Sequence, residues 1–193
     1  MSYRVYTTKG IVLKKKNSGE QNSFLYILTK DLGLIIASAR STRSSKSKLK
    51  GLIEEFSHGD FSFVKGKNGW HLTNVSENGN FFFQAPNHSR KTLAQMAAVL
   101  LKMIQGEEPH KEVYSTVVES FKFLTEVTKD HIHIVEVLSV LRIMYELGYV
   151  RDDNEVTDFL KNDDYSSEIL QQGQDNKIKI VALINRALKE SQL

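Results

Sequence analysis

The stretch DFSFVKGKNGWHLTNV, residues 60–75, carries the clearest β-hairpin signal in the sequence. Phe61 and Phe63 alternate with polar neighbours, as in a strand with one buried face. Asn68 and Gly69 suit the two central positions of a type I′ turn. We therefore predict two antiparallel strands here, with both phenylalanines in a core.

Three further strand-like runs precede this hairpin, at residues 7–14, 24–29 and 34–39. In the first, Gly10 is where the sequence would tolerate a bend or a close backbone approach, and Gly33 can supply the positive φ of the turn between the other two. Leu49, Leu52, Ile53 and Phe56 have the i, i+3, i+4, i+7 spacing of a short helix. Five short strands with a helix before the fourth predict a small Greek-key barrel, of which the oligonucleotide/oligosaccharide-binding (OB) fold is the common nucleic-acid-binding form.

From residue 80 onward the periodicity is helical. Amphipathic segments end near Ile104, Thr128 and Tyr145, with Ser89 as the N-cap of the first. A short helix is expected around Phe159, and a final one on which five residues, all but Asn185 apolar, line one face: Ile178, Val181, Ala182, Asn185 and Leu188. The predicted fold class is α+β, with a five-stranded OB-fold β-barrel at residues 1–79 followed by an all-α helical domain at residues 80–193.

Composition narrows the function classes. The chain has 193 residues and no cysteine, which excludes disulfides, iron–sulfur clusters and thiolate zinc sites. No apolar run resembles a signal peptide or membrane span, so we expect a cytoplasmic, nucleoid-associated protein. Residues 1–79 hold 13 Lys and Arg against 6 Asp and Glu, a net charge of +7, whereas residues 80–193 hold 13 against 17, a net of −4. This division predicts that the first domain meets a polyanion.

Residues 39–51, ARSTRSSKSKLKG, place five cations on a Ser-rich segment without any acid. Such a row of donors suits nucleic-acid phosphates, although a solvated loop is the alternative interpretation. Three consecutive lysines in a predicted neighbouring turn strengthen the nucleic-acid reading, and Trp70, beside the hairpin turn, is the candidate for an exposed platform on which bases stack. Phe24 and Tyr26 could also stack on bases, but such residues more often belong to a core. The predicted nucleic-acid-binding residues are Lys14, Lys15, Lys16, Arg40, Arg43, Lys46, Lys48, Lys50 and Trp70.

No pattern supports catalysis or metal binding. His131 and His133 are two residues apart, so on a helix their rings would point to different sides. The sequence has no glycine-rich phosphate loop, no Gly-x-Ser-x-Gly turn and no His-Glu-x-x-His helix. We expect a non-enzymatic protein without a cofactor or a bound metal ion.

Seven short segments together resemble the bacterial recombination mediator RecO family. They are GIVLK at 10–14, GEQN at 19–22, LT at 28–29, GLIIASAR at 33–40, SKSKLKG at 45–51, LRIMYELGYV at 141–150 and ALKESQL at 187–193. The sequence departs from the family at Asn22, where Asp is usual, and at Ser41, where Gly is common. It also lacks the four-cysteine zinc element that many members carry after the pair that is Gly148 and Tyr149 here.

The resemblance implies a recombination mediator that binds single- and double-stranded DNA and anneals complementary strands. It further implies that the protein works with RecR and the single-strand-binding protein to help RecA load. The acidic, apolar tail of the single-strand-binding protein would need a basic and apolar pocket in the helical domain. The candidate cations of this pocket are Arg142, Arg186 and Lys189. The alternative hypothesis is a non-catalytic adaptor whose barrel binds an acidic protein or peptide instead of DNA.

Overall fold

The computed structural model describes residues 4–40, 49, 51–152, 156–161 and 164–191. The chain forms two compact units, Met1–Gln84 with Ile104–Lys111, and Ala85–Met103 with Glu112–Leu193. The boundary predicted between residues 79 and 80 stays a proposal.

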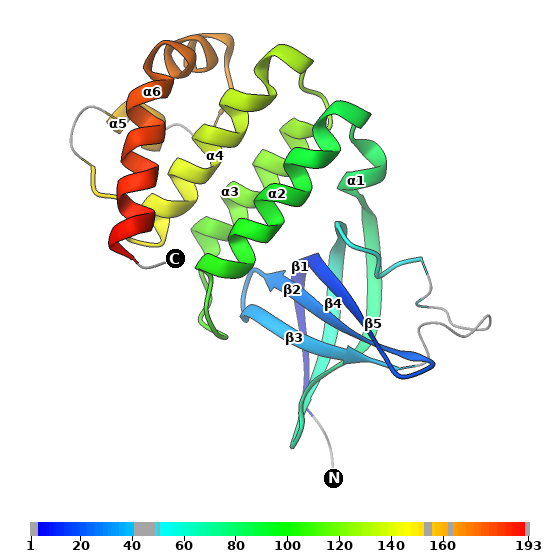
Figure 1. The fold of residues 1–193 in the computed structure, drawn as a ribbon. Helices are drawn as coiled ribbons and strands as arrows, with labels where there is room; N and C mark the ends of the chain where they lie inside the picture. Colours follow the sequence, from blue (N-terminus) through cyan, green and yellow to red (C-terminus); the bar gives the residue numbers. More distant parts are fainter. Residues whose placement is uncertain (1–3, 41–48, 50, 153–155, 162–163, 192–193) are drawn as a thin grey trace. The chain divides into compact units, whose positions relative to one another are not determined.

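The first unit contains a closed β-barrel (Figure 1). Its strands are β1 (Val5–Ser18), β2 (Asn22–Thr29), β3 (Gly33–Ala39), β4 (Ser57–Gly66) and β5 (Gly69–Asn80). They follow the order β1-β2-β3-β5-β4, in which β3 and β5 are parallel and every other neighbouring pair is antiparallel. The predicted five-stranded OB-fold barrel is therefore confirmed.

The barrel interior explains the alternating sequence pattern. Phe61 and Phe63 are fully buried and stack with ring centroids 6.2 Å apart, so their predicted place in the core is confirmed. A Cβ atom at Gly10 would lie 2.9 Å from Ile27 Cγ2, which confirms a close approach at that position. Gly33 has a φ of 71°, as the turn between β2 and β3 requires.

Two local predictions in the barrel are wrong. In place of the expected helix before β4, the described residues from Leu49 to Phe56 form turns, because Gly51 and Phe56 have positive φ values of 90° and 70°. Ile53 still reaches the core and is fully buried. In the β4–β5 hairpin, Gly66 pairs with Gly69, so Lys67 and Asn68 lie at the turn, and the described residues include no positive φ there before Gly69. The turn is therefore not a type I′ turn at Asn68 and Gly69.

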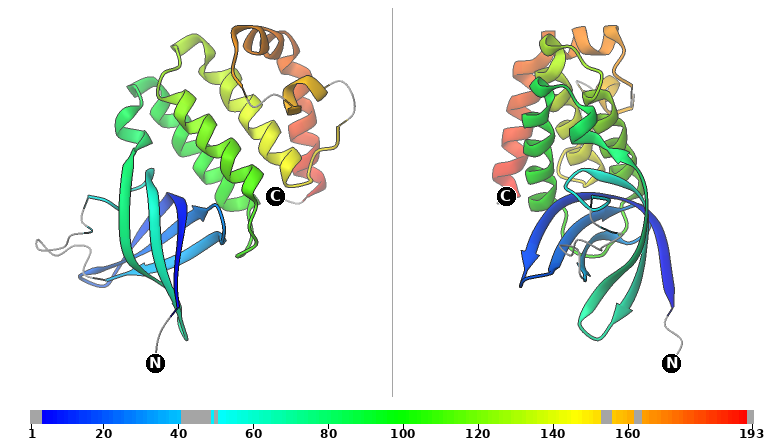
Figure 2. Two further views of the ribbon diagram at one scale, coloured as in Figure 1. Left: turned by 180° about the vertical axis from the view of Figure 1, so that it is seen from behind. Right: turned by 90° about the vertical axis from the view of Figure 1, so that its right-hand side faces the viewer.

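The second unit is helical (Figure 2), as predicted. Its elements are α2 (Asn87–Met103), α3 (Lys111–Leu124, whose first residue belongs to the first unit), η1 (Lys129–His131), α4 (Ile132–Glu146), α5 (Thr157–Lys161) and α6 (Ser167–Glu190), while the short α1 (Phe81–Gln84) follows the barrel. Helix α4 packs against α2, α5 and α6. Among the residues that the structure describes, no helix has the length and apolar character needed to cross a membrane.

Two details of the helices differ from expectation. Ser89 lies within α2 and is fully buried, so it is not the N-cap. Helix α6 buries Ile169, Leu170, Gly173, Ile180, Ile184 and Ala187, whereas Ile178 on the predicted face is 87% exposed. The apolar face predicted for this helix is therefore wrong, because contact with α4 selects another face.

Candidate nucleic-acid interface

The outward side of β1, β2 and β3 brings lysines next to apolar side chains. Because paired residues of antiparallel strands point to the same side of a sheet, the register identifies the neighbours. Lys14 pairs with Tyr26 and Lys16 with Phe24 across β1 and β2, while Tyr26 pairs with Ile36 and Phe24 with Ser38 across β2 and β3. We call these six residues the outer patch: Lys14, Lys16, Phe24, Tyr26, Ile36 and Ser38.

The outer patch is accessible and includes exposed apolar side chains. Phe24 is 43% exposed and Ile36 is 49% exposed, although alternating neighbours such as Leu25 are fully buried. The Nζ atom of Lys16 lies 5.5 Å from the ring centroid of Tyr26, a cation–π geometry that holds the lysine over the patch. Rings with a free face can stack on bases, and adjacent ammonium groups can hold phosphates.

Period-2 alternation places these side chains outward. The run FLYILT at residues 24–29 reads as apolar on both faces, and the structure directs Leu25 and Ile27 inward and Phe24 outward. The sequence pattern indicated Phe24 and Tyr26 as possible stacking residues, but Ile36 was not among the predicted site residues. Counting alternate positions forward from Gly33 places Ile36 on the outward side.

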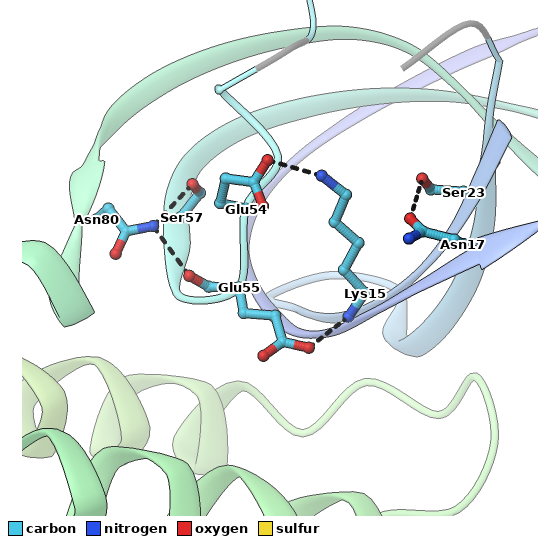
Figure 3. A network of polar contacts seen from close by, with 7 residues as sticks. All are labelled: Lys15, Asn17, Ser23, Glu54, Glu55, Ser57 and Asn80. Atoms are coloured by element: carbon cyan, nitrogen blue, oxygen red, sulfur yellow. Dashed lines mark hydrogen bonds and ion pairs between the residues drawn. The ribbon is translucent and has the colours of Figure 1, made fainter. Parts of the chain in front are cut away.

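The three lysines do not lie in a turn, which corrects the prediction. Strand β1 continues to Ser18, with a register shift between Val12 and Lys14, so that Lys14 and Lys16 are exposed. Lys15 is engaged within the protein: its Nζ lies 2.7 Å from Glu54 Oε1 (Figure 3). Its backbone N–H also donates to Glu55 Oε1, at 3.0 Å.

The network in Figure 3 makes Lys15 a poor phosphate ligand. Its side chain is only 16% exposed, and a carboxylate already neutralises its charge. Asn80 fixes the same segment by donating to the Glu55 carbonyl oxygen and to Ser57 Oγ, at 2.9 and 3.1 Å. Lys15 therefore ties β1 to the segment before β4, and we remove it from the candidate interface.

Trp70 is not an exposed platform, so that expectation is wrong. It is 5% exposed and packs edge-on against Tyr6 and Phe63, with centroid distances of 5.3 and 6.2 Å. The Nζ atom of Lys65 lies 5.0 Å from the Trp70 ring centroid. Trp70 pairs with Lys65, which lies two residues after the buried Phe63 and so on the same side of β4. This pairing places Trp70 on the inward side of the sheet.

The basic segment between β3 and β4 is described only in part. Arg40 is exposed immediately after β3. Arg43, Lys46, Lys48 and Lys50 lie outside the described residues, so their predicted contacts with phosphate remain predictions.

The three cations predicted for partner binding differ in their exposure to solvent. Arg142 is 1% exposed, and its Nε and Nη2 donate to the carbonyl oxygens of Phe159 and Asp164, at 2.8 and 2.9 Å. Its Cζ lies 4.7 Å from the Tyr165 ring centroid. Arg142 is thus a packing residue inside the helical unit, which corrects the prediction that it meets a partner. Arg186 and Lys189 are exposed on α6.

The strand order and the helices that follow define the class of protein: an OB-fold domain joined to an all-α domain. Residues 1–78 match the family model described as "Recombination protein O N terminal". The resemblance to the RecO family is therefore confirmed, and it is carried by the barrel, which lies within the matched residues.

Relatives in several bacteria extend this similarity. The chain is 42% identical over 62 residues to a DNA repair protein RecO of Dehalococcoides mccartyi, covering 32% of this chain and 24% of the relative. It is 33% identical over 99 residues to that of Alkaliphilus metalliredigens, covering 51% and 39%. With the protein of Acetivibrio thermocellus it shares 26% identity over 143 residues, covering 74% and 57%. These alignments span between about a quarter and somewhat over half of each relative's length.

Proposed function

We propose that this chain is a non-catalytic recombination mediator that binds single- and double-stranded DNA during recombinational repair. The observation that carries the proposal is the outer patch, where exposed Phe24 and Ile36 lie beside Lys14 and Lys16. In OB folds, the face of the second and third strands is the usual surface for oligonucleotides. The names of the RecO relatives, which describe DNA repair proteins, support the same role.

The proposed mechanism is neutralisation of phosphates without reading of sequence. Lysines act as point charges and lack the rigid fork with which arginine reads guanine edges. By holding two complementary strands, the basic barrel would raise their local concentration and promote annealing. The helical domain would then contact RecR and the acidic tail of the single-strand-binding protein, with Arg186 and Lys189 as the remaining candidate cations, and so assist the loading of RecA.

Fluorescence anisotropy with a labelled 20-nucleotide oligo(dT) tests this proposal. Phe24→Ala should weaken binding by about 1–3 kcal/mol for each stacked base, or roughly 5- to 150-fold. Phe83→Ala is the matched control, because Phe83 is 69% exposed on α1 and lies outside the outer patch. Equal affinities for the wild type and Phe24→Ala would remove the patch from the interface.

An adaptor that binds an acidic protein is the second candidate function, and the two lysines of the outer patch favour it as much as they favour DNA binding. Polyglutamate of matched charge distinguishes the two. An adaptor should bind polyglutamate as tightly as oligo(dT) and should be insensitive to Phe24→Ala, because a carboxylate polymer offers no base to stack.

A further inference from the structure

A second feature of the barrel surface lies beside the outer patch. It is a groove bounded by β3, the β4–β5 hairpin, Arg40 and Leu49. Its lining residues are Ser38, Arg40, Leu49, Val64, Gly66, Lys67, Asn68, His71, Leu72 and Thr73. Two of them are cations and none of these described residues is acidic. The groove is therefore electropositive.

The groove is built by a specific polar contact. Ser38 Oγ lies 2.6 Å from His71 Nδ1, which joins β3 to β5 at a position where the two strands are paired. The other side of the imidazole lies against Gly66, where a Cβ atom would be 3.1 Å from His71 Nε2. The ring is thus held between Ser38 and Gly66 and forms a fixed wall.

The cations of the groove differ from their neighbour on the same hairpin. Lys65 pairs with Glu107, at 2.6 Å, and covers the Trp70 ring. Lys67 and Arg40 are exposed, and both line the groove. An ammonium and a guanidinium group beside the amide of Asn68 make a donor set that suits a phosphate group.

The groove continues the outer patch around the barrel. Lys16, Phe24, Ser38 and His71 occupy one transverse row, because each is the register partner of the next. With strands about 4.8 Å apart, the row spans about 14 Å along the sheet. A chain that stacks a base on Phe24 can therefore place a neighbouring phosphate near His71.

We infer that this groove is a phosphate-binding subsite for the backbone of single-stranded DNA, in which Arg40 and Lys67 are the charged ligands and Asn68 adds a neutral donor. This inference rests on the proposed function, since it extends the DNA path from β2 and β3 to the β4–β5 hairpin. Along this path single-stranded DNA is favoured over double-stranded DNA, because the path requires an unpaired base on Phe24.

Salt titration of oligo(dT) binding to the full chain tests the subsite. Removing one phosphate contact on a single strand lowers the slope of log affinity against log salt concentration by about 0.7, so Arg40→Ala with Lys67→Ala should lower it by about 1.4. Lys30→Ala is the matched control, because Lys30 is exposed in the turn before β3, at the end away from Arg40. It should leave the slope unchanged. Circular dichroism should give the same spectrum for all variants.

The outcomes separate the two proposals. A wild-type chain that binds no oligo(dT) overturns the proposed function together with the subsite. Wild-type binding that weakens in Phe24→Ala, with an unchanged slope in the double variant, overturns the subsite alone. An equal loss of slope in Lys30→Ala would also overturn it, because the effect would then be one of net charge.

Discussion

Arg142 offers the sharpest test of how the helical unit is held together. Its guanidinium is buried, donates two hydrogen bonds to backbone carbonyl oxygens and lies over the Tyr165 ring. A hydrogen bond to a charged group contributes about 1.5–3 kcal/mol, and a desolvated cation–π contact about 2 kcal/mol. Arg142→Ala removes all three interactions and leaves a void, but local relaxation recovers part of the loss. We expect a decrease of about 3–5 kcal/mol in the free energy of unfolding.

Urea denaturation, followed by circular dichroism at a helical wavelength, measures this loss. Arg186→Ala is the matched control, since Arg186 is exposed on α6, and its effect should stay within about 0.5 kcal/mol. Arg142→Lys should fall between the two, because one ammonium group cannot reproduce the guanidinium fork. A change below 1 kcal/mol in Arg142→Ala would refute the packing role and reopen a role in partner binding.

Three further predictions concern the barrel unit. Gly33→Ala should destabilise the barrel unit by about 2 kcal/mol or more, because the φ of 71° is strained for alanine and the new Cβ would lie 2.4 Å from a carbonyl oxygen. The control Gly19→Ala has a φ of 60° and open space around the new Cβ, so it should cost only about 1–2 kcal/mol. Thermal denaturation measures both losses. The hydrogen bond from Lys65 lowers the pKa of Glu107 below its ordinary value of 4.5. Because the folded protein favours the charged carboxylate, this hydrogen bond stabilises the fold at neutral pH, and the stabilisation is lost as the pH falls through the lowered pKa. Lys65→Ala should raise that pKa in a carboxyl NMR titration, Lys67→Ala should not, and the loss of stability should stay below about 1 kcal/mol. Replacing the four cations between residues 43 and 50 with alanine should lower the salt slope of oligo(dT) binding by roughly 3, and an unchanged slope would remove that segment from the interface.

The barrel could be predicted because its strands carry local signals. Phe61 and Phe63 alternate with polar residues, and Gly33 marks a turn, so the number and type of elements follow from short-range patterns. The position of the hairpin turn could not be predicted in this way. A turn at Lys67 and Asn68, in place of Asn68 and Gly69, moves the partner of Trp70 by two residues, from Lys67 to Lys65. A two-residue shift keeps Trp70 on the side of Phe63, so its burial follows from alternation along the hairpin and was missed because Trp70 was judged by its place beside the turn.

The remaining wrong predictions concern features that depend on tertiary contacts. Residues 49–56 have helical spacing, yet Ile53 is buried by a series of turns that covers the barrel core. Both faces of α6 contain isoleucine, and packing against α4 selects Ile180 over Ile178. The burial of Arg142 depends on carbonyl groups contributed by Phe159 and Asp164, which no pattern around Arg142 indicates. The outer patch could be predicted only in part from the sequence. Alternation places Phe24 on the outward side, but it does not identify the neighbours of Phe24 on other strands.

The parallel pairing of β3 with β5 gives the barrel a line along which it can open. Among the residues that the structure describes, its register contains two pairs, Ala37 with Trp70 and Ser38 with His71, whereas β1 and β4 are paired continuously from Val5 to Ile11. Local opening begins where the fewest interactions must break. A fluctuation there would turn the barrel into a curled sheet hinged on β1 and β4, and would separate Ser38 from His71. Because the proposed DNA path crosses from β3 to β5 at this line, opening would interrupt the path between Ser38 and His71 while the other strand pairs remain intact.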